Sequence, residues 1–290
     1  MPPTVSIVTP SFNQVAYLEE TILSVLGQDY PNLEYIVIDG GSTDGSVDII
    51  KKYAHRLAWW TSEPDQGQSH AVNKGFARAT GDIFHWLNSD DLLMPSAVRI
   101  AASYLERRPE LGVVYGDRLV IDHLGNTLEL MQVPPFWARA LPHHLRIPQE
   151  TVFIRRQFWQ QTQGLDEQLN MCMDFDLYLR LRSMTEFYRI PFILGALRQH
   201  SQSKSTINAD QCRHYGNTEV TRTIIKHHGK PIPRFCRRFY KKANRLRQYV
   251  DQHSRARKKE VQAIMRFIQD RPQIPANSNS HTSSSSKINL

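Results

Sequence analysis

The chain has 290 residues, enough for one large α/β domain with an appendage or for two small domains. Hydrophobic residues make up 40% and charged residues 22%, which excludes wholesale disorder and fibrous architectures. The three cysteines, Cys172, Cys212 and Cys236, are too few and too scattered for a disulfide framework or a zinc site, so a reducing compartment is expected.

The net charge of +8 hides an asymmetry along the chain. Residues 1–211 carry 18 Lys and Arg against 24 Asp and Glu, whereas residues 212–271 carry 17 against 4. An acidic body with a basic extension does not indicate a general nucleic-acid binder, so we expect no nucleic acid as a partner. The sequence also shows no secretion signal and no apolar stretch of bilayer-spanning length, which predicts a cytoplasmic protein.

Strand-like and helix-like segments alternate in the N-terminal part of the chain. Apolar runs predict strands at Val5 to Val8, Tyr35 to Ile38, Leu57 to Thr61 and Ile83 to Leu87. Apolar residues at three- and four-residue spacing and turn signals predict helices at Tyr17 to Leu26, Ser46 to Tyr53 and Ser69 to Ala79. This alternation is typical of a Rossmann-like α/β unit with a parallel sheet.

The alternation loosens after residue 91, which predicts a mixed α+β half. We expect two helices in this half, at Ser96 to Arg107 and at Met173 to Arg182. We also expect strands at Gly112 to Tyr115, Glu186 to Ile190 and Phe192 to Leu197, a hairpin around Leu124 to Asn126, and a Pro-rich passage from Pro134 to Pro148.

The C-terminal part changes in composition. We expect a globular domain over residues 1–207, a basic helical extension over 208–272, and a Ser-rich disordered tail over 273–290. The amphipathic face of the extension predicts either packing on the domain or a second subunit, or contact with an anionic membrane.

Acidic residues follow three consecutive predicted strands. Because parallel strands present their carboxyl ends at one edge, Asp39, Asp65 and the pair Asp90 and Asp91 are expected to converge on one site. Carboxylates without clustered Cys or His favour Mg²⁺ or Mn²⁺, with Asp90 and Asp91 as the best candidates. The alternative is that this pair belongs to a turn capping the helix near Ser96.

Other chemistries lack their sequence signatures. The loop at Asp39 has neither G-x-G-x-x-G spacing nor a following Lys, so a dinucleotide or triphosphate loop is disfavoured, although Asp39 suits a nucleobase imide or ribose hydroxyl. Neither a G-x-S-x-G elbow nor an H-E-x-x-H motif occurs, which excludes the common serine-hydrolase and zinc-protease patterns.

Taken in order, these segments resemble the family 2 glycosyltransferases, which have the GT-A fold. The resemblance spans about Thr4 to Ser205 and rests on the first strand through Asn13, the turn at Asp39, the Asp65 segment, Leu87 to Asp91, the helix from Met173 and the run Leu197 to His200. It implies a nucleotide-binding half fused to a mixed acceptor half.

The resemblance also implies roles for single residues of the donor site. Thr9, Asp39 and Asp65 would face the nucleotide of a nucleotide-sugar donor, with Asp39 reading the base, and Asp90 would lie by the ribose or diphosphate. Asp91 and His200 would hold the divalent Mn²⁺ or Mg²⁺, unless His200 is only a loop histidine.

On the acceptor side, the resemblance implies that Asp174 is the general base. Helix geometry separates it from Asp176, which is expected to be structural, because two residues correspond to a rotation of about 200°. The alternative is that Asp174 only begins a helix. Asn88 and Met173 depart from the common family pattern, where acidic residues are frequent.

The sequence therefore predicts an inverting, metal-assisted transferase that moves a sugar, with a UDP-sugar as the expected donor, to a glycan or lipid-linked acceptor. Polysaccharide or glycolipid biosynthesis at the inner face of a membrane is the expected setting, with acceptor contacts from Pro134 to Glu150. The alternative is a non-catalytic protein whose basic helices bind an anionic membrane or nucleic acid. A glycoside hydrolase would need two carboxylates and no metal, and a nucleotidyltransferase a Gly-rich triphosphate loop.

Overall fold

The computed structural model describes residues 1–133 and 147–204, together with residues 219, 222, 223, 226 and 227. The strands are β1 (Val5–Ser11), β2 (Leu33–Asp39), β3 (Trp59–Ser62), β4 (Ile83–Trp86), β5 (Leu92–Leu93), β6 (Leu111–Ile121), β7 (Thr127–Met131), β8 (Phe153–Arg155) and β9 (Glu186–Arg198). The α-helices are α1 (Leu18–Leu26), α2 (Ser46–Tyr53), α3 (Gln68–Arg78), α4 (Ala97–Arg107), α5 (Arg156–Thr162) and α6 (Met173–Leu181). Two short 3₁₀ turns lie at Ala54–Arg56 and Gln149–Thr151.

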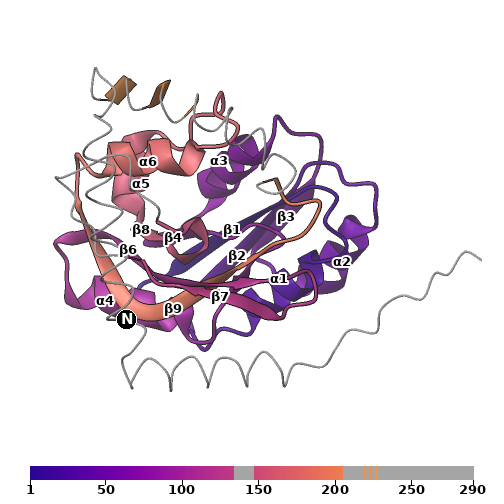
Figure 1. Cartoon of the computed structure of the whole chain (residues 1–290), viewed down its shortest axis with the longest axis horizontal. Coiled ribbons are helices and arrows are strands. Elements are labelled where there is room, and N and C mark those ends of the chain that lie inside the picture. Colours follow the sequence, from indigo (N-terminus) through magenta and orange to yellow (C-terminus); the bar gives the residue numbers. More distant parts are fainter. Residues whose placement is uncertain (134–146, 205–218, 220–221, 224–225, 228–290) are drawn as a thin grey trace, which may run out of the picture.

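The described strands form one mixed sheet in the order β3-β2-β1-β4-β8-β6-β9-β5, with β7 paired to β6 (Figure 1). Strand β1 is parallel to β2 and β4, and β2 is parallel to β3. This arrangement confirms the predicted βα half, whose elements lie within a few residues of their expected bounds. The parallel pairing brings the carboxyl ends of these strands to one edge.

Alternation along buried β1 divides the hydrophobic core into two layers. Ile7 packs in the layer that holds α1, α2 and α4, while Val8 packs in the layer that holds α3 and α6. Helix α3 approaches the sheet closely, because a Cβ added to Gly75 would clash with the Val8 side chain. The sheet is therefore covered on both faces, as a largely apolar parallel sheet requires.

Strand β8 joins the two halves of the sheet, because it pairs antiparallel with both β4 and β6. Strand β9 then runs parallel to β6 along its whole length. The predicted mixed second half is confirmed in class, and so is the hairpin, which connects β6 to β7. Neither β8 nor α5 was expected from the sequence.

Two strand predictions were wrong in extent. The runs Glu186 to Ile190 and Phe192 to Leu197 form one strand, because the register shift opposite Tyr115 and Asp117 accommodates Pro191. The strand predicted at Gly112 to Tyr115 continues to Ile121 as β6, since Gly116 and Asp117 interrupt the apolar run without ending the strand.

Several predictions fall outside the described residues. These are the domain boundaries near residues 207 and 272, most of the Pro-rich passage, most of the basic segment 212–271, and the Ser-rich tail. Within the described part of the chain, no helix is both long enough and apolar enough to span a bilayer.

Candidate active site

The carboxylate of Asp39, at the end of β2, organises the loop that follows it. Its Oδ2 accepts hydrogen bonds from the backbone N–H groups of Gly41 (3.1 Å) and Ser42 (2.8 Å) and from the Ser62 hydroxyl (2.7 Å). Its Oδ1 accepts one from the Ser42 hydroxyl (2.5 Å). The side chain is fully buried.

The loops after β2, β3 and β4 lie against one another. Asp65 Oδ1 accepts from the backbone N–H of Gly67 at 2.7 Å, and a Cβ added to Gly40 would lie 2.8 Å from Asp65 Oδ2. At the start of α3, Gln68 Nε2 donates to Asn88 Oδ1 at 2.7 Å. The acidic ends of three strands are thus brought to one edge, as the sequence predicted.

The C-terminal end of β9 fastens the turn that contains Asp90 and Asp91. The backbone N–H of Arg198 donates to Asp91 Oδ1 at 3.0 Å, and its guanidinium donates to the backbone oxygen of Asp90 at 3.1 Å. His200 Nε2 lies 3.1 Å from Asp90 Oδ2. Asn88 Nδ2 donates to Asp91 Oδ2 at 3.1 Å. Asp91 therefore does not cap α4, whose N-cap residue is Ser96.

Negative charge accumulates around Asp91. Burial raises the pKa of Asp91 well above its usual value, and the negative charges of Asp90 and Glu150 raise that pKa further. Glu150 is buried and pairs with Arg118 Nη1 at 3.4 Å. The negative charges of Asp90 and Glu150 near the buried Asp91 are unfavourable for its ionised form, and a bound cation would offset them.

Asp174 occupies the first turn of α6, near enough to Glu150 for the charge of that residue to act on it. Burial raises the pKa of Asp174 to about 6; the negative charge of Glu150 raises this pKa, whereas the Arg118 guanidinium and the N–H of Phe175 lower it. The hydroxyl of Tyr178, one turn along the same helix, is buried with no hydrogen-bond partner among the described residues. Burial raises the pKa of Tyr178, and the negative charge of Asp174 raises it further. The Asp174 carboxyl, with a pKa of about 6, is therefore suited to exchange a proton near neutral pH.

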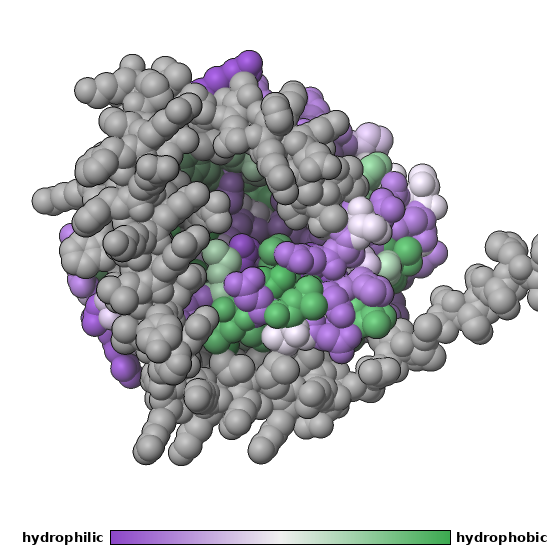
Figure 2. Space-filling model, in the orientation of Figure 1, coloured by the Kyte–Doolittle hydropathy of each residue, from purple (hydrophilic) through white to green (hydrophobic). Residues whose placement is uncertain are grey.

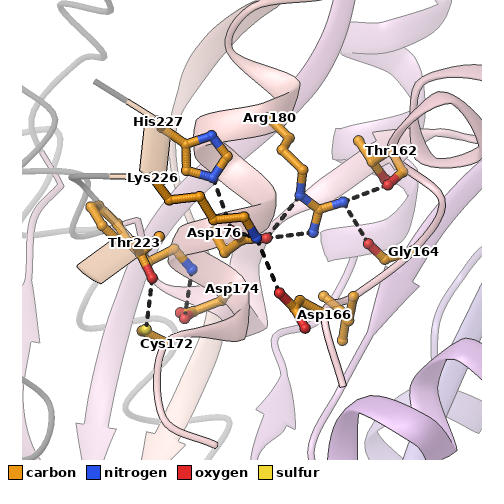
Figure 3. Close-up of polar contacts among 12 residues, drawn as sticks. Thr162, Gly164, Asp166, Cys172, Asp174, Asp176, Arg180, Thr223, Lys226 and His227 are labelled. Carbon is orange, nitrogen blue, oxygen red and sulfur yellow. Dashed lines mark hydrogen bonds and ion pairs between the residues drawn. The ribbon is translucent and has the colours of Figure 1, made fainter. Parts of the chain in front are cut away.

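Asp176 points away from Asp174, into a separate ion-pair cluster (Figure 3). Its buried carboxylate pairs with Arg180 Nη2 at 2.7 Å and with His227 Nε2 at 2.9 Å. Contacts from His227, Arg180 and Lys226 lower the pKa of Asp176 against the effect of burial. The structural role expected for Asp176 agrees with these contacts.

The structure places Asp39, Asp65, Asp90 and Asp91 in neighbouring loops at one edge of the sheet, with His200 beside Asp90. Around the centre of the face in Figure 2, a hollow carries hydrophilic residues beside hydrophobic ones. The buried Thr9 hydroxyl lies 3.0 Å from the hydroxyl of Tyr35, and the contact of Thr9 with a nucleotide stays a prediction.

Four residues of this region were not singled out from the sequence: Arg118, Glu150, Arg198 and Lys204. Lys204 Nζ lies 3.5 Å from Gln68 Oε1. Burial lowers the pKa of Lys204, whereas the negative charge of Asp174 raises it. Arg118 and Glu150 carry no local motif, because β6 and the turn Gln149–Thr151 meet only in the folded chain. Arg198 was visible as part of the run Leu197 to His200.

The described residues contain no group of three His, Cys, Asp or Glu side chains gathered closely enough to hold a metal ion. The oxygen-rich pair Asp90 and Asp91, with the imidazole of His200 beside it, nevertheless fits Mn²⁺ or Mg²⁺ if other ligands come from a bound diphosphate. Burial is the main cause of the raised pKa of Asp91, and a bound cation would offset the further contribution from the negative charges of Asp90 and Glu150.

Comparison with known proteins decides the family. Residues 6–166 match the model of glycosyl transferase family 2, which is more than half of the chain. The chain belongs to this family. As a family 2 glycosyltransferase it is an enzyme. A relative named as an uncharacterised glycosyltransferase, from Mycobacterium tuberculosis, is 33% identical over 199 residues, covering 66% of this chain and 74% of that protein.

A second relative is much longer than the glycosyltransferase described here. Chondroitin synthase of Escherichia coli is 29% identical over 216 residues, which cover 72% of this chain and 31% of the synthase. The chain therefore spans about a third of that relative.

Solved structures confirm the GT-A fold. S. aureus TarS 1-349 in complex with UDP-GlcNAc aligns with a TM-score of 0.61 and 15% identity, over 78% of this chain and 67% of that one. The mannosyltransferase PcManGT from Pyrobaculum calidifontis, in complex with GDP-Man and Mn²⁺, aligns with a TM-score of 0.61 and 18% identity, over 80% of this chain and 66% of that one.

Proposed function

We propose that this glycosyltransferase moves a sugar from a nucleoside-diphosphate sugar to an acceptor hydroxyl, with Asp174 as the general base and inversion at the anomeric carbon. The position of Glu150 carries this proposal. It lies close enough to Asp91 and to Asp174 for its charge to raise the pKa of both, so the candidate donor and acceptor residues border one site.

The reaction uses the raised pKa of Asp174. The acceptor hydroxyl gives its proton to the Asp174 carboxylate while its oxygen bonds to the anomeric carbon. The bond between that carbon and the diphosphate oxygen breaks, and its electron pair leaves with the nucleoside diphosphate. A base with a pKa of about 6 is mostly ionised at pH 7 and still accepts a proton readily.

Asp91, with Asp90 and His200 beside it, would hold a divalent cation at the diphosphate. A cation there offsets the negative charge that develops on the leaving group. Asp90 and Asp91 would themselves bind and orient the donor. Their position is fixed by Arg198, which bonds the turn that carries them. The Mn²⁺ in the PcManGT complex supports this proposal by analogy of fold.

The nucleotide is proposed to bind at the loops of Asp39 and Asp65, with Thr9 and Asp90 completing the pocket and UDP as the first nucleotide to test. The fold it shares with the UDP-GlcNAc complex of TarS supports that choice. We further propose a glycan or lipid-linked acceptor and a role in polysaccharide or glycolipid synthesis on the cytoplasmic side of a membrane. The similarity to chondroitin synthase supports the polysaccharide part of this proposal.

A thermal-shift panel tests the donor site. The full chain is melted with UDP-, GDP-, dTDP- and CMP-sugars, each with and without Mn²⁺, beside Asp91→Ala and the milder Asp91→Asn. A ligand that binds only the folded state raises the melting temperature. We expect a Mn²⁺-dependent rise for one nucleotide class that both variants lose. If no nucleotide raises the melting temperature with or without Mn²⁺, the proposed function is wrong.

A further inference from the structure

Helix α6 is held by residues that come from outside the matched family region. Residues 219, 222, 223, 226 and 227 are helical, and we call them the docking segment. Spacings of four residues place Glu219, Thr223 and His227 on the same face of a helix. This face contacts the start of α6 and the loop before it (Figure 3).

Glu219 fastens the chain where it enters α6. Its carboxylate accepts hydrogen bonds from the backbone N–H groups of Asn170 (3.1 Å) and Met171 (2.8 Å) and from the Cys172 thiol (3.4 Å). Cys172, the N-cap residue, makes no capping hydrogen bond with its own side chain. Glu219 therefore fixes the two residues that lead into the N-cap of α6, and its negative charge suits the positive end of the helix dipole.

His227 holds α6 one turn further along. Its Nε2 lies 2.9 Å from Asp176 Oδ1, while Arg180 bonds the other oxygen of Asp176 and donates to the backbone oxygens of Thr162 (2.6 Å) and Gly164 (2.7 Å). Lys226 adds an ion pair to Asp166 at 3.1 Å. A buried carboxylate with several partners fixes the position of its helix, because losing a partner leaves charge uncompensated.

Asp174 lies between these two attachments, at Cys172 and Asp176. We propose that Glu219 and His227 are positioning residues, which hold α6 so that Asp174 faces the acceptor hydroxyl and stays shielded from water. This inference rests on the proposed role of Asp174 as the base. It gives the docking segment a function in catalysis although the segment contributes no reacting group.

The test uses the full chain with Glu219→Ala and His227→Ala, measured for kcat, for KM of the donor, and for the acidic limb of the pH profile. His227→Gln keeps a hydrogen-bond donor for the Asp176 carboxylate, so it serves as the rescue variant. Arg222→Ala is the matched control, because Arg222 is exposed on the same segment. Amide hydrogen exchange over α6 reports the helix position independently of activity.

Displacing a catalytic group by about 1 Å costs up to roughly 100-fold in rate. We therefore expect kcat to fall by about 10- to 100-fold in both alanine variants, with the donor KM unchanged, faster exchange in α6, and recovery in His227→Gln. The acidic limb moves to lower pH, because Asp174 gains water while Glu150, Arg118, Tyr178 and Lys204 still face it.

The inference is overturned if both alanine variants keep the kcat and the acidic limb of Arg222→Ala, or if the control loses as much. Failure of the proposed function has a different signature: Asp174→Asn would then retain transfer, whatever the docking variants do to hydrogen exchange in α6. The two failures are therefore distinguishable in one set of proteins.

Discussion

The acidic residues in the parallel half of this glycosyltransferase are held by different kinds of contact from those in the mixed half. Asp39 and Asp65 accept hydrogen bonds mainly from residues two or three positions away, so their loops are formed by local sequence. Asp174 instead has Glu150 and Arg118 as its charged neighbours, which arrive from two other elements. One half presents preformed binding loops, whereas the other tunes a proton acceptor through long-range contacts.

The largest effect is expected from Asp174→Asn, which removes the proposed proton acceptor of the mixed half. The amide cannot accept the acceptor proton, so we expect transfer to fall by roughly 10²- to 10⁴-fold while donor binding is kept. Transfer by the wild type is expected to rise with pH through about 6, as Asp174 ionises. Initial rates from pH 4.5 to 8, with donor affinity measured alongside, check both statements. Weakened donor binding with intact transfer chemistry would contradict this assignment.

The same variant should gain stability. The pKa of Asp174 is higher in the folded chain than the ordinary 3.8, so its stabilising contribution is full below pH 3.8 and is lost as pH rises through about 6. Removing the ionisable group is thus expected to raise the free energy of unfolding at pH 7 to 8 by roughly 1–3 kcal/mol. Denaturant unfolding at pH 4 and pH 7.5 measures the difference, which should shrink at the lower pH.

In the parallel half, Asp39→Asn should act mainly through the loop. The amide keeps one acceptor but loses charge-assisted bonds from Ser42 and Ser62, so we expect a loss of about 1–3 kcal/mol in the free energy of unfolding and weaker nucleotide binding. Asp48→Asn is the control, because Asp48 is exposed on α2. Equal stability of the two variants in urea would show that the loop does not depend on Asp39.

The smallest expected effect tests the link between the halves. Glu150→Gln removes a negative charge that raises the pKa of Asp174, so the acidic limb of the rate profile should move to lower pH, by a few tenths to about one unit. Glu129→Gln, at an exposed position on β7, is the matched control. A limb shifted to higher pH, or shifted equally in the control, would show that Glu150 does not act on Asp174.

Sequence reasoning reached the first half of the fold almost element by element. Helix α2 has the predicted bounds, and the convergence of the acids after β2, β3 and β4 followed from parallel pairing alone. It missed β8 and α5, and it split β9 at Pro191, because a bulge absorbed the proline. It also placed Asp174 and Asp176 on different faces of α6 from helix geometry.

The strand and helix periods and the acidic strand ends could be read from the sequence, because each depends on residues close together in the chain. The family could be read from the order of several such short motifs. Only the tertiary structure decided that Glu150 lies by both Asp91 and Asp174, that Arg198 fastens the Asp90–Asp91 turn, and that Glu219 and His227 hold α6. These contacts join residues dozens of positions apart. The pKa values that depend on them are set by burial and by charges that no local pattern records.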